Sequence, residues 1–82
     1  MALLPLSGTF LGDVTTVGVV VDDEDTAEAV GQKIAHHAVG RRVAARTAPI
    51  RVRLGGRVLD PDEIIGRTGV SPYDHVEVFF DE

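Results

Sequence analysis

Apolar and polar positions change their spacing several times along the chain, and each spacing predicts a different element. Residues 9–22 are rich in β-branched and aromatic side chains, Gly12-Asp13 supplies a turn, and the expected strands cover residues 2–11 and 14–21. Such runs separated by a turn signal predict a β-hairpin. Gly18, inside the second predicted strand, suggests a bulge or a close backbone approach.

A helical spacing follows the hairpin. Apolar residues recur every three or four positions at Ala27, Val30, Ile34 and Ala38, which is typical of one face of a helix. The small residues Gly31 and Ala35 beside them would let this helix lie close to a sheet. Asp25 is expected to cap the helix, with Glu28 completing a capping box. Gly40 is expected to end it.

The second half of the chain returns to an alternating pattern. Ile50, Val52 and Leu54 alternate with arginines, which predicts a half-buried strand. Gly55-Gly56 predicts a type I′ turn, and residues 57–59 form the expected return strand. Residues 60–65 predict one short helical turn, with Pro61 near its start. Residues 76–80 alternate again and predict the last strand.

The order of these elements predicts the fold class. Two strands, a helix, two strands, a short helix and a final strand are best buried as one helix on one mixed sheet. We therefore expect an α+β protein with a β-grasp, or ubiquitin-like, arrangement of four to five strands packed on one main helix. The closing run GVSPYDHVEVFF also resembles the end of ubiquitin-like domains. Residues 1–82 are expected to form a single domain of this kind.

Length and composition limit what such a domain can do. The chain has 82 residues and no cysteine, so it has neither disulfides nor thiolate metal sites to reinforce a small core. Residues 1–13 show no basic segment followed by an apolar run, so we expect no signal peptide. The longest apolar run, residues 17–21, is too short to span a membrane. These features together favour a cytoplasmic protein with no membrane partner.

Charge is strongly segregated along the chain. The formal net charge is −5, yet residues 29–59 contain no acid at all. Seven basic residues fall inside residues 33–57: Lys33, Arg41, Arg42, Arg46, Arg51, Arg53 and Arg57. A fold that gathers them on one side makes the domain dipolar, and a dipolar surface concerns association more than fold.

Side chains that could carry chemistry of their own are few. His36 and His37 are adjacent, so on a helix their side chains point about 100° apart, whereas helical metal pairs use i, i+4 spacing. We expect one of them at the surface and the other partly packed against the sheet. Gly55-Gly56 lacks the Lys-Ser/Thr of a phosphate loop, and no nucleophile elbow surrounds either serine. The sequence therefore predicts no catalytic residue, no cofactor and no metal site in this chain.

Several uses of the basic segment stay open. The arginines of residues 41–57 could contact phosphates in a nucleic-acid-binding module, although the negative net charge and the lack of interleaved aromatics disfavour nucleic acid. They could also be solvated without a partner. A stand-alone ubiquitin-like interaction module is a further alternative. Arginine suits protein interfaces, so a docking face built on Arg41, Arg42 and Arg46 is the preferred interpretation, with Tyr73 and an apolar strand edge adding the non-polar contact.

The run VVVDDEDTAEAVGQKIAHHAVGRRVAARTAPIRVR carries a family resemblance, through Lys33, Ala35, His37, Arg41-Arg42-Val43, Arg46 and Arg51-Val52-Arg53. It resembles the small B, or gamma, subunits of toluene-4-monooxygenase and related bacterial multicomponent diiron monooxygenases. The ending GVSPYDHVEVFFDE looks like that of the same family.

The resemblance implies a non-catalytic accessory subunit. It would bind the large alpha subunit, which holds the diiron centre, within a hydroxylase of paired alpha, beta and gamma subunits. The complex would oxidise toluene-like aromatic or alkene substrates with O2 in aromatic hydrocarbon catabolism. Together with the charge pattern, the resemblance predicts a partner interface at His37, Arg41, Arg42, Arg46, Arg51, Arg53 and Tyr73.

Overall fold

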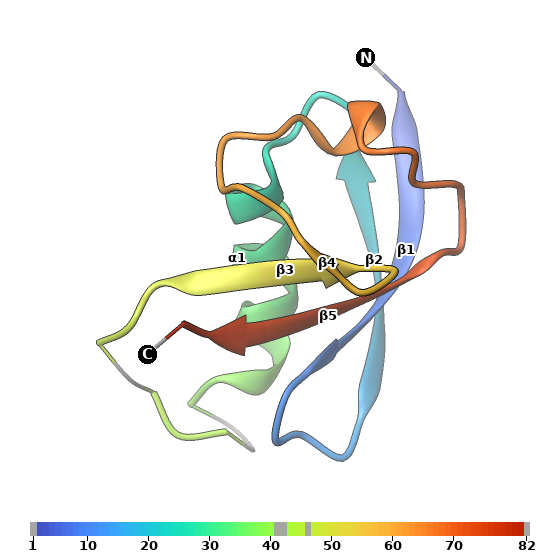
Figure 1. Cartoon of the computed structure of the whole chain (residues 1–82). Coiled ribbons are helices and arrows are strands. Elements are labelled where there is room, and N and C mark those ends of the chain that lie inside the picture. Colours follow the sequence, from blue (N-terminus) through green and yellow to red (C-terminus); the bar gives the residue numbers. More distant parts are fainter. Residues whose placement is uncertain (1, 41–42, 46, 82) are drawn as a thin grey trace.

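The computed structural model describes residues 2–40, 43–45 and 47–81, and within them one helix packs on one sheet (Figure 1). The elements in chain order are β1 (Leu3–Phe10), β2 (Thr16–Asp22), α1 (Ala27–Ala38), β3 (Ile50–Leu54), β4 (Arg57–Val58), the 3₁₀ helix η1 (Ile65–Arg67) and β5 (His75–Phe80). This order confirms the sequence-based prediction element by element, except for the start of the short helix.

The five strands form one mixed sheet in the order β2-β1-β5-β3-β4. β1 pairs antiparallel with β2 and parallel with β5, whereas β3 pairs antiparallel with both β5 and β4. The first and last strands are therefore neighbours at the centre of the sheet. This is the predicted α+β β-grasp arrangement.

The core lies between α1 and one face of the sheet, here called the inner face. Alternate residues of β1 and β5 point into it, together with the apolar face of α1. The largest fully buried side chains are Phe10, Ile34, Leu59, Ile65, Val21, Val30, Val52, Val76 and Val78. Within the described residues no polar or charged residue is buried, so burial of apolar surface provides the main stabilisation. No helix in this described part is long and apolar enough to cross a membrane.

Small residues bring α1 close to the sheet, as expected. A Cβ atom on Gly31 of α1 would lie 3.0 Å from a methyl carbon of Val52 in β3. On the opposite side of the contact, a Cβ atom on Gly8 of β1 would overlap the side chain of Ile34. The two glycines thus set the separation of helix and sheet.

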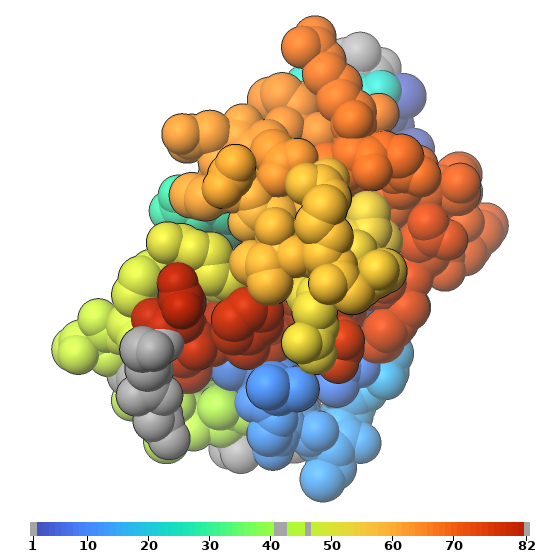
Figure 2. Space-filling view, in the orientation of Figure 1, coloured from blue at the N-terminus to red at the C-terminus, as the bar shows by residue number. Residues whose placement is uncertain are grey.

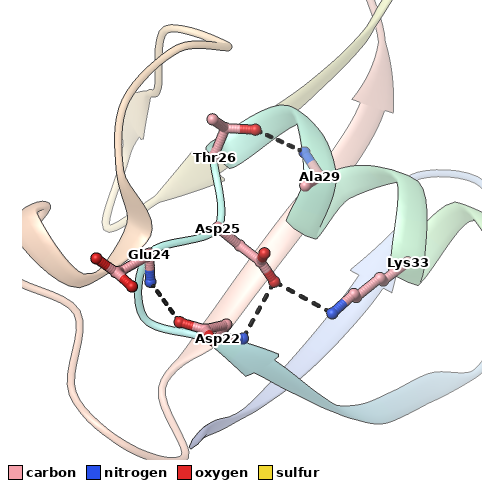
Figure 3. Close-up of polar contacts among 6 residues, drawn as sticks. All are labelled: Asp22, Glu24, Asp25, Thr26, Ala29 and Lys33. Atoms are coloured by element: carbon pink, nitrogen blue, oxygen red, sulfur yellow. Dashed lines mark hydrogen bonds and ion pairs between the residues drawn. The ribbon is translucent and has the colours of Figure 1, made fainter. Parts of the chain in front are cut away.

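The prediction for the helix cap was wrong. Thr26 is the N-cap, and its Oγ1 accepts a hydrogen bond from the Ala29 N–H at 3.2 Å (Figure 3). The position three residues after this cap is Ala29, which has no side-chain acceptor, so Glu28 does not complete a capping box.

Asp25 instead joins β2 to the helix. Its Oδ2 accepts a hydrogen bond from the Asp22 N–H and pairs with Lys33 Nζ, both at 3.1 Å (Figure 3). Asp22 in turn accepts the Glu24 N–H through Oδ1 at 2.9 Å. The acidic run after β2 therefore builds the turn that leads into α1.

Three further expectations meet the structure differently. Gly18 forms no bulge, because the β1–β2 register runs unbroken from the Leu3–Asp22 pair to the Thr9–Thr16 pair, and a Cβ atom there would meet nothing within 4 Å. His36 and His37 are both exposed, so the expected difference in burial between them is not seen. The helical turn expected at residues 60–65 begins only at Ile65. By contrast, Gly55 and Gly56 have φ values of 58° and 84°, as the type I′ turn requires.

Candidate protein-docking face

Two of the predicted interface arginines lie side by side on the sheet face that points away from α1, here called the outer face. Val52 of β3 is buried, so its neighbours Arg51 and Arg53 point outward. Arg53 donates to Glu77 through Nε at 3.0 Å and Nη2 at 2.9 Å. Arg53 also stacks over the Phe79 ring, 5.9 Å from its centroid. The guanidinium is thereby fixed by groups of this chain.

Arg51 is also engaged within the chain. Its Nε lies 3.5 Å from Asp81 Oδ2, and its Nη1 donates to the Ile50 carbonyl at 3.2 Å. The acids that follow the basic segment in sequence therefore return to it in space through β5. A role for Arg51 and Arg53 at a partner surface stays a prediction.

Arg57 closes the loop after β4. It donates to both carboxylate oxygens of Glu63, at 3.1 and 3.2 Å, while Glu63 accepts the Asp60 N–H. The hydrogen bond from the Asp60 backbone, helped by Arg57, lowers the pKa of Glu63 below its usual 4.5. The β3–β4 hairpin and the segment after it cover much of one face of the molecule (Figure 2).

We expect Glu63→Gln to make the free energy of unfolding depend less on pH at acidic pH. Because the folded pKa is below the unfolded one, the contribution of Glu63 is fully present above pH 4.5 and is lost as the pH falls through the folded pKa. Urea unfolding at a series of pH values from 7 downward tests this. The free energy of unfolding should fall less steeply below about pH 4.5 in the variant; an unchanged slope would contradict the assignment.

These ion pairs weaken the nucleic-acid alternative. Arg51, Arg53 and Arg57 each have a carboxylate partner in the same chain. Phosphate binding depends on cations that are available to replace counterions, so three of the basic residues that such a footprint needs are already neutralised.

Tyr73 lies on a different part of the surface. It precedes β5, has a positive φ of 69° and is 81% exposed. Its N–H donates to the Pro5 carbonyl at 2.7 Å, which holds the loop against β1. The ring borders a hollow of about 370 Å³ with Pro5, Ser7, Val19 and Val20.

His37 lies near the end of α1, and its ring stacks edge-on against His36 with centroids 5.5 Å apart. Both histidines line a groove of about 460 Å³ between α1 and β2. The wall formed by α1 also includes Gln32 and Lys33. This groove therefore joins a predicted interface residue to the open edge of the sheet.

The structure brings the predicted residues together only in part. Tyr73 and His37 border two hollows that share residues 18–20 of β2. Arg51 and Arg53 lie on β3, three strands away from β2, which is about 14 Å at the usual strand spacing. Arg41, Arg42 and Arg46 lie outside the described residues.

Sequence reasoning missed Val20, which is 56% exposed and borders both hollows. The signal was present in the run Val19-Val20-Val21. Successive strand residues point to opposite faces, so three valines in a row cannot all face one core. In the structure the middle one, Val20, lies on the outer face.

Comparison with known proteins now identifies the family. The family model for toluene-4-monooxygenase system protein B, TmoB, matches residues 3–80. The chain belongs to the TmoB family. One relative of this TmoB-family chain is the hydroxylase component subunit gamma of the toluene-4-monooxygenase system of Ectopseudomonas mendocina, 34% identical over 84 residues and the full length of both chains. Another is the oxygenase component subunit gamma of the alkene monooxygenase system of Xanthobacter autotrophicus, 39% identical over 62 residues, or 73% of this chain and 70% of the relative.

Solved structures place the TmoB-family chain in the same context. It superimposes with a TM-score of 0.92 on a chain of the toluene 4-monooxygenase HD complex with the inhibitor 4-bromobenzoate, at 33% identity, covering 98% of this chain and 100% of that one. Caldiarchaeum subterraneum ubiquitin gives a TM-score of 0.74 at 18% identity, covering 99% and 96% of the two chains. The latter similarity confirms the ubiquitin-like fold alone.

Proposed function

We propose that this TmoB-family chain is the gamma subunit of a bacterial diiron monooxygenase hydroxylase. It has no catalytic role of its own and binds the large alpha subunit, in a complex of paired alpha, beta and gamma subunits that hydroxylates toluene-like or alkene substrates with O2. The observation that carries the proposal is the full-length match to a hydroxylase gamma subunit, at 34% identity over the whole of both chains. Residues 1–82 act as one domain in this proposal, and the complex is cytoplasmic.

The chemistry of the described residues supports a partner that holds the iron. Diiron carboxylate sites combine inward-facing glutamates with histidines on facing helices. Within the described residues, the one group of three possible metal ligands that comes together is Asp22, Asp23 and Glu24, with atoms within 4.8 Å of one another and no histidine. These carboxylates do not fit a diiron centre, and we propose that the diiron centre lies in the alpha subunit.

The proposed contact combines charge and apolar surface. Arg41, Arg42 and Arg46 follow the end of α1 in a stretch without acids, and we infer that they meet carboxylates of the alpha subunit. His37 is in the preceding turn of α1, and Tyr73 offers an exposed aromatic ring, the kind of side chain that is enriched at interfaces. Arg51 and Arg53 would contribute as an ordered, partly neutralised pair at the rim.

Reversal of charge at Arg42 tests this proposal. The Arg42→Glu subunit is co-expressed with the alpha and beta subunits, and the complex is recovered on a tag carried by alpha. Truncating one partner of a buried, hydrogen-bonded interfacial charge pair costs about 2–5 kcal/mol, so recovery should fall at least about tenfold if Arg42 forms such a pair, and it should become more sensitive to salt.

Arg67→Glu is the matched control. Arg67 is exposed and has no ion pair among the described residues, so the variant makes the same change in net charge outside the basic segment. Its recovery should equal that of the wild type. Equal recovery for reversals at Arg41, Arg42 and Arg46 would place the interface elsewhere, and failure of the wild-type chain to bind alpha would refute the proposed function itself.

A further inference from the structure

The edge strand β2 has an unprotected edge. Natural sheets guard edge strands with charges, prolines, bulges or short length. β4, at the other edge of the sheet, is two residues long. β2 is seven residues long, has neither proline nor charge before Asp22, and pairs with β1 without a bulge.

The register shows which backbone groups this edge exposes. The N–H groups of Ser7 in β1 and of Leu11, which follows β1, donate to the carbonyls of residues 74 and 78, on the β5 side. Backbone groups of successive strand residues point to alternate sides, so the even-numbered residues of β1 face β2. Their register partners are Val21, Val19 and Val17.

The other residues of β2 therefore point their backbone N–H and C=O groups away from the sheet: Thr16, Gly18, Val20 and Asp22. Two hydrogen bonds agree with this assignment. The Asp23 N–H points toward β1 and donates to the Ala2 carbonyl. The Asp22 N–H points away from β1 and donates to the Asp25 carboxylate. Among the residues that the structure describes, β2 pairs with β1 alone, so Gly18 and Val20 offer adjacent unpaired backbone donors and acceptors at the edge.

A hollow lies on each side of these two residues. On the inner side is the groove of about 460 Å³ with α1, and on the outer side is the hollow of about 370 Å³ with Pro5 and Tyr73. Residues 18–20 line both. An extended strand laid along this edge would send alternate side chains into the two hollows.

The two hollows differ in chemistry. The helix wall of the inner groove offers Lys33, His36 and His37, and none of the described residues that line the groove is acidic. Lys33 is already paired with Asp25, but its side chain keeps 46% exposure. The outer hollow is lined mostly by apolar groups, with Val20 and Tyr73 exposed. The inner groove therefore suits a carboxylate on one side of an extended segment. The outer hollow suits an aliphatic side chain on the other side of the same segment.

We infer that β2 receives an extended acidic-aliphatic segment of the large hydroxylase subunit, which adds to the sheet as a sixth strand at Gly18 and Val20. This inference rests on the proposed function and specifies how the two subunits join. Main-chain hydrogen bonds would supply affinity, and the two flanking hollows would supply specificity.

Proline substitution at the open edge tests the inference. Val20→Pro removes an outward N–H without removing a bond to β1, and the ring blocks the edge. Co-expressed with alpha and beta, the variant should be recovered with alpha at least about tenfold less than the wild type. Thr16→Pro is the matched control, because its N–H also points outward on the same strand but lies outside both hollows; its recovery should stay within about twofold of the wild type.

Hydrogen exchange resolved by residue gives an independent readout on the wild-type chain. The amides of Gly18 and Val20 should exchange fast in the isolated subunit and slow by about a hundredfold or more in the complex with alpha. The Val19 amide, bonded to β1, should be slow in both. This readout keeps the inference testable even where Val20→Pro fails to fold, which circular dichroism of both variants would reveal.

The outcomes separate the inference from the proposed function. Wild-type binding to alpha with Gly18 and Val20 still exchanging fast overturns the docking mode and leaves the proposed function standing. Slow exchange of both amides in an isolated, dimeric chain also overturns it, because a second copy would then occupy the edge. If the wild-type chain does not bind alpha at all, the proposed function and the inference fail together.

Discussion

Phe10→Ala is expected to lower the free energy of unfolding by about 3–5 kcal/mol. Phe10 is 1% exposed at the end of β1, and its ring meets Phe80 of β5 edge-on, with centroids 5.0 Å apart. Truncation would remove the aromatic pair and leave a cavity in the core, next to β1 and β5. For so small a domain this is a large share of the total stability, which is about 5–15 kcal/mol in typical proteins.

Urea unfolding followed by circular dichroism measures the loss. Leu11→Ala is the matched control, because Leu11 is the next residue in sequence but is 53% exposed. Its effect should stay below about 0.5 kcal/mol. Similar losses in the two variants would mean that Phe10 does not anchor the core.

Gly8→Ala is expected to destabilise the fold by about 1–3 kcal/mol, although alanine normally suits a strand better than glycine. The added methyl would overlap the side chain of Ile34, which is fully buried in α1. The helix would have to move away from β1, or Ile34 would have to leave its rotamer.

Two variants test this steric cause. Ile34→Val removes the Ile34 atom nearest to the new methyl, Cδ1, so the double variant with Gly8→Ala should be more stable than the sum of the two single effects predicts. Gly18→Ala makes the same change in β2 where nothing lies within 4 Å, and it should be neutral or slightly stabilising. Equal losses at Gly8 and Gly18 would exclude the proposed overlap.

Periodicity was sufficient to predict the fold. Residues 50–54 and 76–80 alternate, and residues 27–38 show helical spacing. In each case the apolar positions indicate which face meets the core. All three elements lie where these patterns put them. The cap was less predictable because Asp25 and Thr26 both offer an acceptor, and the choice depends on contacts with Asp22 and Lys33.

The candidate site was only partly predictable for a different reason. The pairing of Arg53 with Glu77 joins residues 24 apart in sequence, and it depends on the register of β3 against β5. No local pattern contains that register. The sequence therefore shows a segment rich in basic residues, whereas the structure shows that several of them form ion pairs with carboxylates of the same chain.

The same limit applies to β2. Its three consecutive valines show that an apolar side chain must face outward, but not that the strand forms an edge. β2 lies at the edge because it pairs with β1 alone, whereas the other side of β1 pairs with β5. The predicted interface residues His37 and Tyr73 border hollows that share residues 18–20 of β2, and only this topology brings them there.

The parallel pairing of β1 with β5 has a consequence for biosynthesis. Ser7 pairs with His75 and Phe10 with Val78, so the middle of the sheet cannot close until β5, which follows the other strands in the chain, has left the ribosome. Until then the N-terminal hairpin and α1 expose the apolar faces that β5 will cover, a state that favours aggregation or chaperone binding. This domain should therefore fold only after β5 has been synthesised, and its recruitment into a larger assembly would begin only after that step.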